Sequence, residues 1–217
     1  MIELSKETRR AINQVYLYLF SALLLSTGVV VYLTNNQELL TFLTTGCAFV
    51  SVLVASFIAV IAIGLVADSR SGRVAAICLY AFSVLFSVLT ASIVSKYTTT
   101  GIVNCFLAAT ILFAVMGIYG MVTKKDISNW GSMLLFALIA VIAISIVNVF
   151  VGSSALEMIL SAITVIVFMA FNAHDHQMMV SKLDGNHTHG DVIMSAANLY
   201  LNFVNIFIHL LSLFGDE

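Results

Sequence analysis

Long runs of apolar side chains, most of them twenty residues or more, constrain this chain more than any other feature of its sequence. About twenty helical residues, each rising 1.5 Å, cross a hydrocarbon core of roughly 30 Å. Of the 217 residues, 61% are hydrophobic and 9% are charged, whereas about 25% are charged in an average soluble domain. The sequence therefore predicts an integral membrane protein embedded in a lipid bilayer.

Only short polar connectors separate the apolar runs, and no soluble domain or linker is visible between them. Backbone amides in lipid must bond within one helix or in a closed barrel, and these runs lack the alternation of polar and apolar residues that barrel strands show. We therefore predict an all-α polytopic membrane protein, with residues 1–217 as a single transmembrane domain. The predicted helices are 11–33, 41–67, 74–94, 101–122, 130–151, 158–179 and 192–214.

The nine basic residues predict the orientation of the chain. Only Lys96 lies in a connector on one side of the predicted membrane. The others share the opposite side and are Lys6, Arg9, Arg10, Arg70, Arg73, Lys124, Lys125 and Lys182. Because cytoplasmic loops are enriched in lysine and arginine, the N-terminus is predicted to be cytoplasmic. The short loops and modest size favour a bacterial plasma membrane.

Charge and cysteine usage exclude two kinds of partner. The net charge is −2, and the basic residues form no stripe with interleaved aromatics, so we predict no nucleic acid partner. The three cysteines lie within apolar runs, where a free cysteine behaves as a small hydrophobe. No Cys-x-x-Cys spacing occurs, and we predict no cofactor.

Polar side chains recur along one face of the last predicted helix. Their spacing alternates between four and three residues, which places them on a single helical face. They are Asp191, Ser195, Asn198, Asn202, Asn205, His209 and Ser212. Two interpretations are open, because such a stripe can supply interhelical hydrogen bonds or line a polar pathway. Three asparagines and a histidine exceed what packing requires, which favours the pathway.

Asp175 is a carboxylate placed well inside the predicted helix 158–179, on a face shared with Ser161, Thr164 and Asn172. A buried aspartate in a membrane is a candidate functional residue, and its charge responds to nearby cations and to pH.

Two other interpretations of Asp175 are an ion pair and a metal site shared with its neighbours. Lys182 follows two turns later on the same face, so Asp175 can instead form a structural ion pair. His174 and His176 flank Asp175 but are expected to project from other faces, so the three side chains cannot chelate one ion from a single helix.

Two segments carry a recognisable pattern, FAVMGIYG from Phe113 to Gly120, followed by KKD at 124–126, and LYLNFVNIF from Leu199 to Phe207. The first segment resembles the fourth helix and basic turn of the Bax inhibitor-1 (transmembrane Bax inhibitor motif) family. The second is similar to the leucine-tyrosine-leucine-aspartate-phenylalanine-isoleucine-asparagine run of the same family. Asp175 falls where the sixth helix of the family carries an aspartate.

The resemblance implies a seven-helix bundle in which six helices surround a central C-terminal helix, with a pH-sensitive calcium leak through it. It thereby makes Asp175 the candidate contact for Ca²⁺, because this ion prefers carboxylate oxygens. Family members with paired aspartates use them as a proton-sensitive dyad at the cytoplasmic end of the pore. Asp175 matches the first aspartate, whereas Asn202 stands at the second and cannot titrate. A basic latch of the family corresponds to Arg70. The candidate pore and gate residues are Asp175, Asn202, Asn172, Asn198, Asn205, His209 and Arg70.

The predicted function is a cation leak channel, and Ca²⁺ is the expected ion. The alternative is a non-conducting regulator that binds other membrane proteins, as some bacterial relatives are associated with a membrane-anchored ATP-dependent protease. An intramembrane aspartyl protease needs two carboxylates that share a proton. Because Asn202 replaces the second carboxylate, we predict no enzymatic activity.

Overall fold

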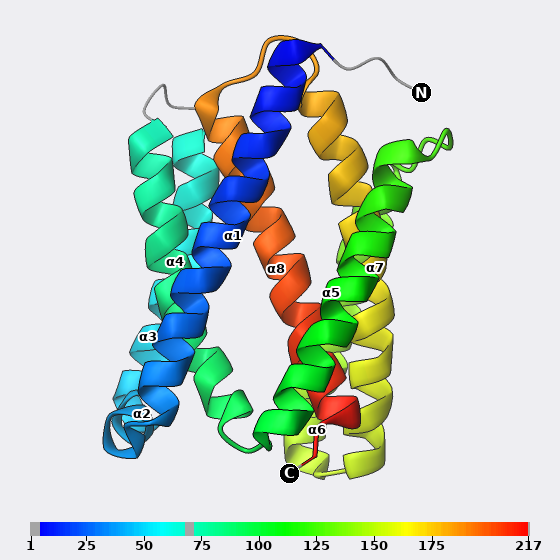
Figure 1. Cartoon of the computed structure of the whole chain (residues 1–217). Coiled ribbons are helices and arrows are strands. Elements are labelled where there is room, and N and C mark those ends of the chain that lie inside the picture. Colours follow the sequence, from blue (N-terminus) through cyan, green and yellow to red (C-terminus); the bar gives the residue numbers. More distant parts are fainter. Residues whose placement is uncertain (1–4, 68–71, 217) are drawn as a thin grey trace. The chain divides into compact units, whose positions relative to one another are not determined.

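A computed structural model describes residues 5–67 and 72–216 (Figure 1). These residues form eight helices and no strands, and seven of the helices are long and apolar enough to cross a membrane. The prediction of an all-α polytopic membrane protein is confirmed. The helices are α1 (Lys6–Thr34), α2 (Gln37–Leu43), α3 (Gly46–Ala67), α4 (Gly72–Val94), α5 (Thr99–Val122), α6 (Trp130–Val151), α7 (Ser154–Leu183) and α8 (His189–Phe214).

The second apolar run is divided into two helices. The short helix α2 ends at Leu43, and the side-chain hydroxyl of Thr44 donates to the Leu40 carbonyl at 2.7 Å. Gly46 then has φ +57°, a left-handed conformation that glycine adopts without steric cost. The predicted helix 41–67 spans this break, because hydropathy does not register a turn made of threonines and a glycine.

Helix α8 runs without interruption for 26 residues, which corresponds to about 39 Å at 1.5 Å per residue. This length suffices for a complete crossing. Beyond its end, the Asp216 carbonyl accepts a hydrogen bond from the Thr98 amide at 2.8 Å, at the start of α5. The last helix therefore ends beside the start of α5.

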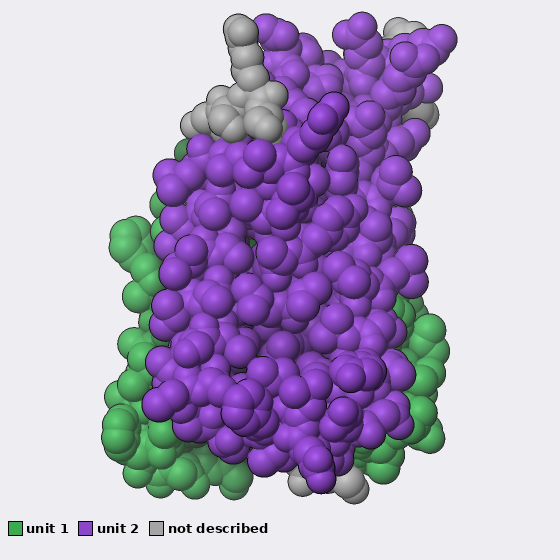
Figure 2. Space-filling model, turned by 90° about the vertical axis from the view of Figure 1, so that its left-hand side faces the viewer, with its two compact units in different colours: residues 1, 97–178, 201–217 green, residues 2–96, 179–200 purple. Residues whose placement is uncertain are grey.

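The described chain divides into two compact units (Figure 2). Unit 1 contains residues 97–178 and 201–216, with α5, α6, most of α7 and the second half of α8. Unit 2 contains residues 5–67, 72–96 and 179–200, with α1 to α4, the last turn of α7 and the first half of α8. The predicted bundle of six helices around a central one concerns both units together and stays a prediction.

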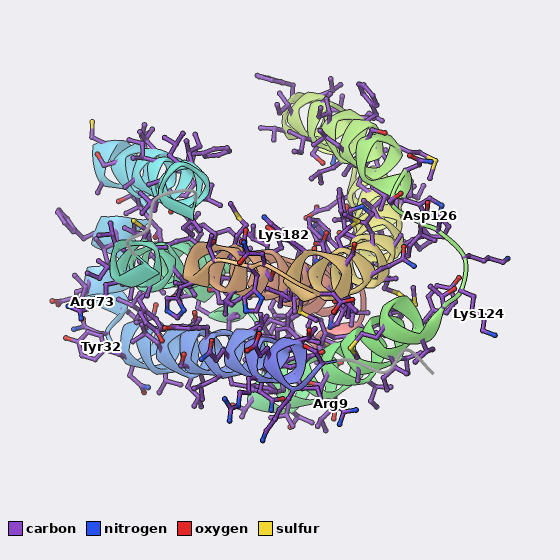
Figure 3. The ribbon with its side chains drawn as sticks, turned by 90° about the horizontal axis from the view of Figure 1, so that it is seen from above. Arg9, Tyr32, Arg73, Lys124, Asp126 and Lys182 are labelled. Carbon is purple, nitrogen blue, oxygen red and sulfur yellow. The ribbon has the colours of Figure 1, made fainter. Side chains whose placement is uncertain are left out.

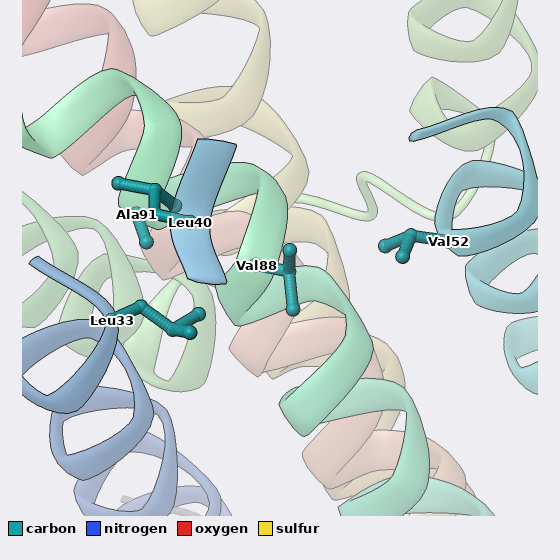
Figure 4. Close-up of a cluster of buried hydrophobic side chains, with 5 residues drawn as sticks. All are labelled: Leu33, Leu40, Val52, Val88 and Ala91. Atoms are coloured by element: carbon teal, nitrogen blue, oxygen red, sulfur yellow. The ribbon is translucent and has the colours of Figure 1, made fainter. Parts of the chain in front are cut away.

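In unit 2, α4 packs against α1 and α3, and the short α2 lies against all three. A buried apolar cluster joins these elements (Figure 4) and consists of Leu33, Leu40, Val52, Val88 and Ala91. In the absence of a hydrophobic force between helices in lipid, close packing of this kind is what holds them together.

In unit 1, α5 approaches α7 closely because glycines line the contact. A Cβ atom added at Gly120 would overlap the Ala173 carbonyl oxygen, so the two backbones touch there. Earlier in α5, Phe106 and Phe113 make edge-to-face contacts with Phe203 of α8, with ring centroids 5.4 and 5.6 Å away. Such aromatic pairs fix the angle between helices.

The molecular surface is strongly apolar, as expected for contact with lipid. Large side chains are widely exposed on α3 and α6, and Phe150 of α6 is 86% exposed. In unit 2, Arg9 of α1, Arg73 of α4 and Lys182 of α7 lie toward one end, onto which Figure 3 looks. Thr8 also donates to Asp184 at 3.2 Å, which holds the α7–α8 connector at the start of α1.

Candidate functional site

Asp175 of α7 and Asn202 of α8 lie in direct contact within unit 1. The Asn202 side-chain nitrogen donates to the Asp175 carboxylate oxygen Oδ2 at 2.7 Å. Asn202 is buried, whereas the Asp175 side chain is 15% exposed. An amide and a carboxylate from two candidate membrane spans therefore form one polar contact, which we call the gate pair.

The second Asp175 oxygen is held by a histidine that the sequence analysis assigned to another face. His174 Nδ1 lies 3.0 Å from Asp175 Oδ1, and His174 Nε2 lies 3.2 Å from the Ser128 carbonyl oxygen. Adjacent helical residues differ by about 100° in direction, but the χ angles of these two side chains bring their ends together. The expectation that His174 points away from Asp175 is therefore wrong.

The ion pair considered between Asp175 and Lys182 is not formed among the described residues. Lys182 Nζ instead lies 2.8 Å from Asp191 Oδ1, at the start of α8. Thr188 donates to the other Asp191 oxygen through both its amide and its hydroxyl, at 2.8 Å each. Asp191, the first residue of the polar stripe, therefore caps α8 rather than lining a path.

Gln177, two residues beyond Asp175 in α7, fastens the α5–α6 connector to α7. Its side-chain oxygen accepts from the Ile127 amide at 2.9 Å, and its side-chain nitrogen donates to the Lys125 carbonyl at 2.8 Å. Both bonds satisfy backbone groups of the connector, the Ile127 amide and the Lys125 carbonyl, which lie outside the helices and so lack the pairing that a helix supplies. The sequence analysis missed this residue, because a lone glutamine in a polar stretch is common.

Asn172 and His176, three residues before and one residue after Asp175, connect α7 to α5. Asn172 donates to the Phe113 carbonyl at 2.8 Å, and its own Oδ1 is buried with no hydrogen-bond partner. The buried His176 ring packs edge-on against Phe113 at 5.4 Å, and Gly117 leaves room for it. Asn172 thus serves the α5–α7 contact directly.

Comparison with known proteins decides the family. The sequence model of a family described as "Inhibitor of apoptosis-promoting Bax1" matches residues 8–217. The chain belongs to the Bax inhibitor-1 family. The resemblance noted at Phe113–Gly120 and Leu199–Phe207 is thereby confirmed.

Bacterial members of the Bax inhibitor-1 family are similar over nearly the whole chain. The "Inner membrane protein YbhL" of Escherichia coli K12 is 31% identical over 211 residues, covering 94% of this chain and 90% of its own. "Uncharacterized protein RP147" of Rickettsia prowazekii is 32% identical over 217 residues, covering 96% and 90%. With seven candidate spans, the chain is a multi-pass protein of the bacterial inner membrane.

The polar stripe of this Bax inhibitor-1 member is used in three ways. Ser195 and Asn205 hydrogen-bond carbonyls of their own helix, those of Asp191 and Leu201, at 2.8 Å each. Asn198 is exposed. Asp191, Asn202, His209 and Ser212 contact α7, Asp191 through its ion pair with Lys182, so the interpretation of interhelical bonding applies to part of the stripe.

Of the remaining candidate residues, His209 belongs to a second polar group and Arg70 is not among the residues that the structure describes. Ser161 Oγ lies 3.3 Å from His209 Nδ1 and 3.2 Å from Ser212 Oγ, toward the start of α7 and the end of α8 relative to the gate pair. In the parts of the chain that the structure describes, no three histidine, cysteine, aspartate or glutamate side chains are grouped to hold a metal ion. The calcium contact at Asp175 stays a prediction.

Tyr200 is a buried polar residue that the sequence analysis did not select. Its hydroxyl lies 2.7 Å from Ser26 Oγ of α1 and 3.5 Å from the Ser83 carbonyl of α4, within unit 2. The rings of Phe82 and Phe86 contact it edge-on. A tyrosine between Asn198 and Asn202 but off the polar face carries no signal in hydropathy, because its ring counts as apolar.

Replacing Tyr200 by phenylalanine is expected to lower the free energy of unfolding by about 1 kcal/mol, the usual value of an interhelical hydrogen bond in a membrane. The change removes one hydroxyl and leaves Ser26 with its longer, 3.4 Å bond to the Ser83 carbonyl. Thermal unfolding in detergent measures the loss. Tyr32→Phe is the matched control because Tyr32 is 62% exposed, and equal midpoints for the two variants would contradict the expectation.

Proposed function

We propose that the chain is a cation leak channel, conducting Ca²⁺, with the gate pair near its cytoplasmic end. The observation that carries the proposal is the 2.7 Å contact between Asn202 and Asp175, since it places a partly exposed carboxylate between two membrane-spanning helices. Carboxylates in such positions are costly and mark ion pathways in membrane proteins. A single carboxylate gives a passing cation an attractive contact without holding it tightly.

The polar group Ser161, His209 and Ser212 supports the same proposal. It lies on α7 and α8, as the gate pair does. It supplies oxygen and nitrogen atoms toward the start of α7 and the end of α8. A conducting pathway needs polar contacts at successive depths, each weak enough for the ion to leave. The gate pair and the group Ser161, His209 and Ser212 both belong to unit 1.

We also propose that the chain is not an enzyme. Proteolysis by an aspartate dyad requires two carboxylates sharing one proton, and the side chain against Asp175 is an amide that donates a hydrogen bond. Asn202 can orient Asp175, but it cannot accept or release a proton at physiological pH.

The test is calcium entry into liposomes that contain the purified protein, measured between about pH 5 and pH 8. Asp175→Asn is expected to reduce entry about tenfold, because the negative charge that attracts the cation is lost. Glu157→Gln is the matched control, since Glu157 is an exposed carboxylate in the first turn of the same helix.

Equal entry with the folded wild type and with Asp175→Asn would remove Asp175 from the pathway. Absence of entry with every folded variant would overturn the channel and favour the regulator that binds other membrane proteins.

A further inference from the structure

One face of α1 carries basic side chains at its start and exposed apolar side chains beyond them. Steps of three or four residues separate the members of this face, so they lie in one line along the helix. They are Lys6, Arg10, Asn13, Leu17, Phe20 and Leu24, with Arg9 beside them, and all of them are exposed. We call these residues the outer face of α1.

The opposite face of α1 is the one that packs within unit 2. Helix α1 lies against α4 there, and its buried residues include Thr8, whose hydroxyl donates to Asp184 at 3.2 Å. Thr8 is two residues from both Lys6 and Arg10, and at about 100° per residue it points to the other side of the helix. Figure 3 shows Arg9 on the side of α1 that faces away from Lys182. The Asp184 carboxylate therefore meets α1 away from its basic residues.

The positive charges at the start of the outer face have little compensation. Among residues 5–67 and 72–216, no carboxylate forms an ion pair with Lys6, Arg9 or Arg10. Glu7 is the acidic residue of the first turn, and it offsets one of the three positive charges. Basic side chains at a membrane surface attract anionic lipid headgroups, and the guanidinium group of arginine matches the oxygens of a phosphate.

The distances along the outer face match the thickness of one bilayer leaflet. At 1.5 Å per residue, Leu17 lies about 10 Å beyond Arg10 and Leu24 lies about 21 Å beyond it. One leaflet, headgroup region included, is about 20–22 Å thick, which is half of the bilayer. With Arg10 at the level of the phosphates, Leu17 lies among the acyl chains and Leu24 lies near their ends. Leu17 and Leu24 are 68% and 74% exposed, so both can contact an acyl chain.

We propose that the outer face of α1 binds one anionic phospholipid. The headgroup phosphate lies at the basic residues of this face, and an acyl chain lies along its apolar residues. The start of α1 is predicted to be cytoplasmic, and the cytoplasmic leaflet is the one that carries anionic headgroups. This lipid site does not depend on whether the chain conducts calcium.

The combination of several bases with an exposed apolar length distinguishes α1 from other lipid-exposed helices. Helix α6 is more exposed, but it begins with Trp130, Gly131 and Ser132 and has no basic residue in its first turn. Helix α4 has a single base there, Arg73. An acidic protein segment would also be attracted by the bases of α1, but the apolar part of the outer face lies at a depth that only lipid or another helix reaches.

Native mass spectrometry of the full-length protein with added phosphatidylglycerol or phosphatidylcholine tests the headgroup. The wild type is expected to retain phosphatidylglycerol in preference to phosphatidylcholine with the same acyl chains. Arg9→Gln combined with Arg10→Gln should weaken retention of phosphatidylglycerol about thirtyfold, since each base near an anionic headgroup contributes about fivefold. Lys124→Gln combined with Lys125→Gln is the matched control, because it removes the same charge from the α5–α6 connector.

Two outcomes of this measurement would overturn the proposal. One is equal retention of the two lipids by the wild type. The other is an equal loss in the two double variants, which would show a general effect of charge rather than a site on α1. An excess of glycerol phosphate should leave the bound phosphatidylglycerol in place. Displacement by this soluble headgroup would show a phosphate site without an acyl chain and would also count against the proposal.

A second measurement leaves every basic residue in place and tests the acyl chain. Trp130 is the one tryptophan of the chain, so Phe20→Trp combined with Trp130→Phe puts a single fluorophore on the outer face. In mixed liposomes, phosphatidylglycerol brominated on its acyl chains should quench this tryptophan at an about tenfold lower fraction than brominated phosphatidylcholine does. Equal quenching by the two lipids would overturn the proposal and leave the bases of α1 to a water-soluble acidic partner.

Discussion

Gly120→Val is expected to prevent α5 from packing on α7 and to lower the free energy of unfolding by more than about 3 kcal/mol. The added Cβ would overlap the Ala173 carbonyl oxygen and lie 2.9 and 3.0 Å from the Ala173 carbonyl carbon and Cα. These are backbone atoms of a continuous helix and cannot rotate away as a side chain would. Overpacking of flexible side chains already costs about 1–3 kcal/mol.

The measurement is thermal unfolding in detergent, followed by size-exclusion chromatography of the heated sample. Gly28→Val is the matched control because it makes the same exchange within α1, where no atom lies within 4 Å of the new Cβ. A Gly120→Val protein that unfolds at the same temperature as the control would show that α5 and α7 do not approach as closely as described.

Asn202→Asp is expected to create a strong pH dependence that the wild type lacks at this position. The new carboxylate would stand where the amide lies 2.7 Å from Asp175, and two ionised carboxylates at 4 Å repel by about 4 kcal/mol at an effective dielectric constant of about 20. The pair avoids this cost by keeping one shared proton. The variant should therefore be stable at low pH and lose stability as the pH rises and that proton is released.

Unfolding midpoints at several pH values between about 5 and 8 test the expectation, with calcium entry measured in parallel. Parallel pH curves for the wild type and for Asn202→Asp would contradict the sharing of a proton.

Hydropathy predicted the membrane-crossing helices well because a span needs about twenty apolar residues whatever its neighbours are. It did not predict the break before Gly46, which depends on one left-handed backbone conformation. It also did not predict how far α7 extends. That helix begins at Ser154 and ends at Leu183, and its polar last turn is stabilised by contacts rather than by lipid.

The candidate site was predictable only where helical spacing determines it. Spacing placed Asp175 and Asn202 on polar faces of their helices, and the structure brings them together. It failed for His174, whose contact with Asp175 depends on side-chain rotation. It also failed for Gln177, whose partners are backbone groups of a connector. Asn198 shares the spacing of Asn202 and yet is exposed, so periodicity alone does not distinguish the two.

The contact of Tyr200 with Ser26 also has a consequence for the order of biogenesis. Ser26 and Tyr200 are separated by 174 positions, so the ribosome has finished most of the chain before the tyrosine leaves the exit tunnel. Until then the newly inserted α1 and α4 lack the aromatic side chain that fills the space between Ser26 and Phe82. The first four helices are therefore an unfinished intermediate in the membrane, and insertion of α8 is the step that completes them.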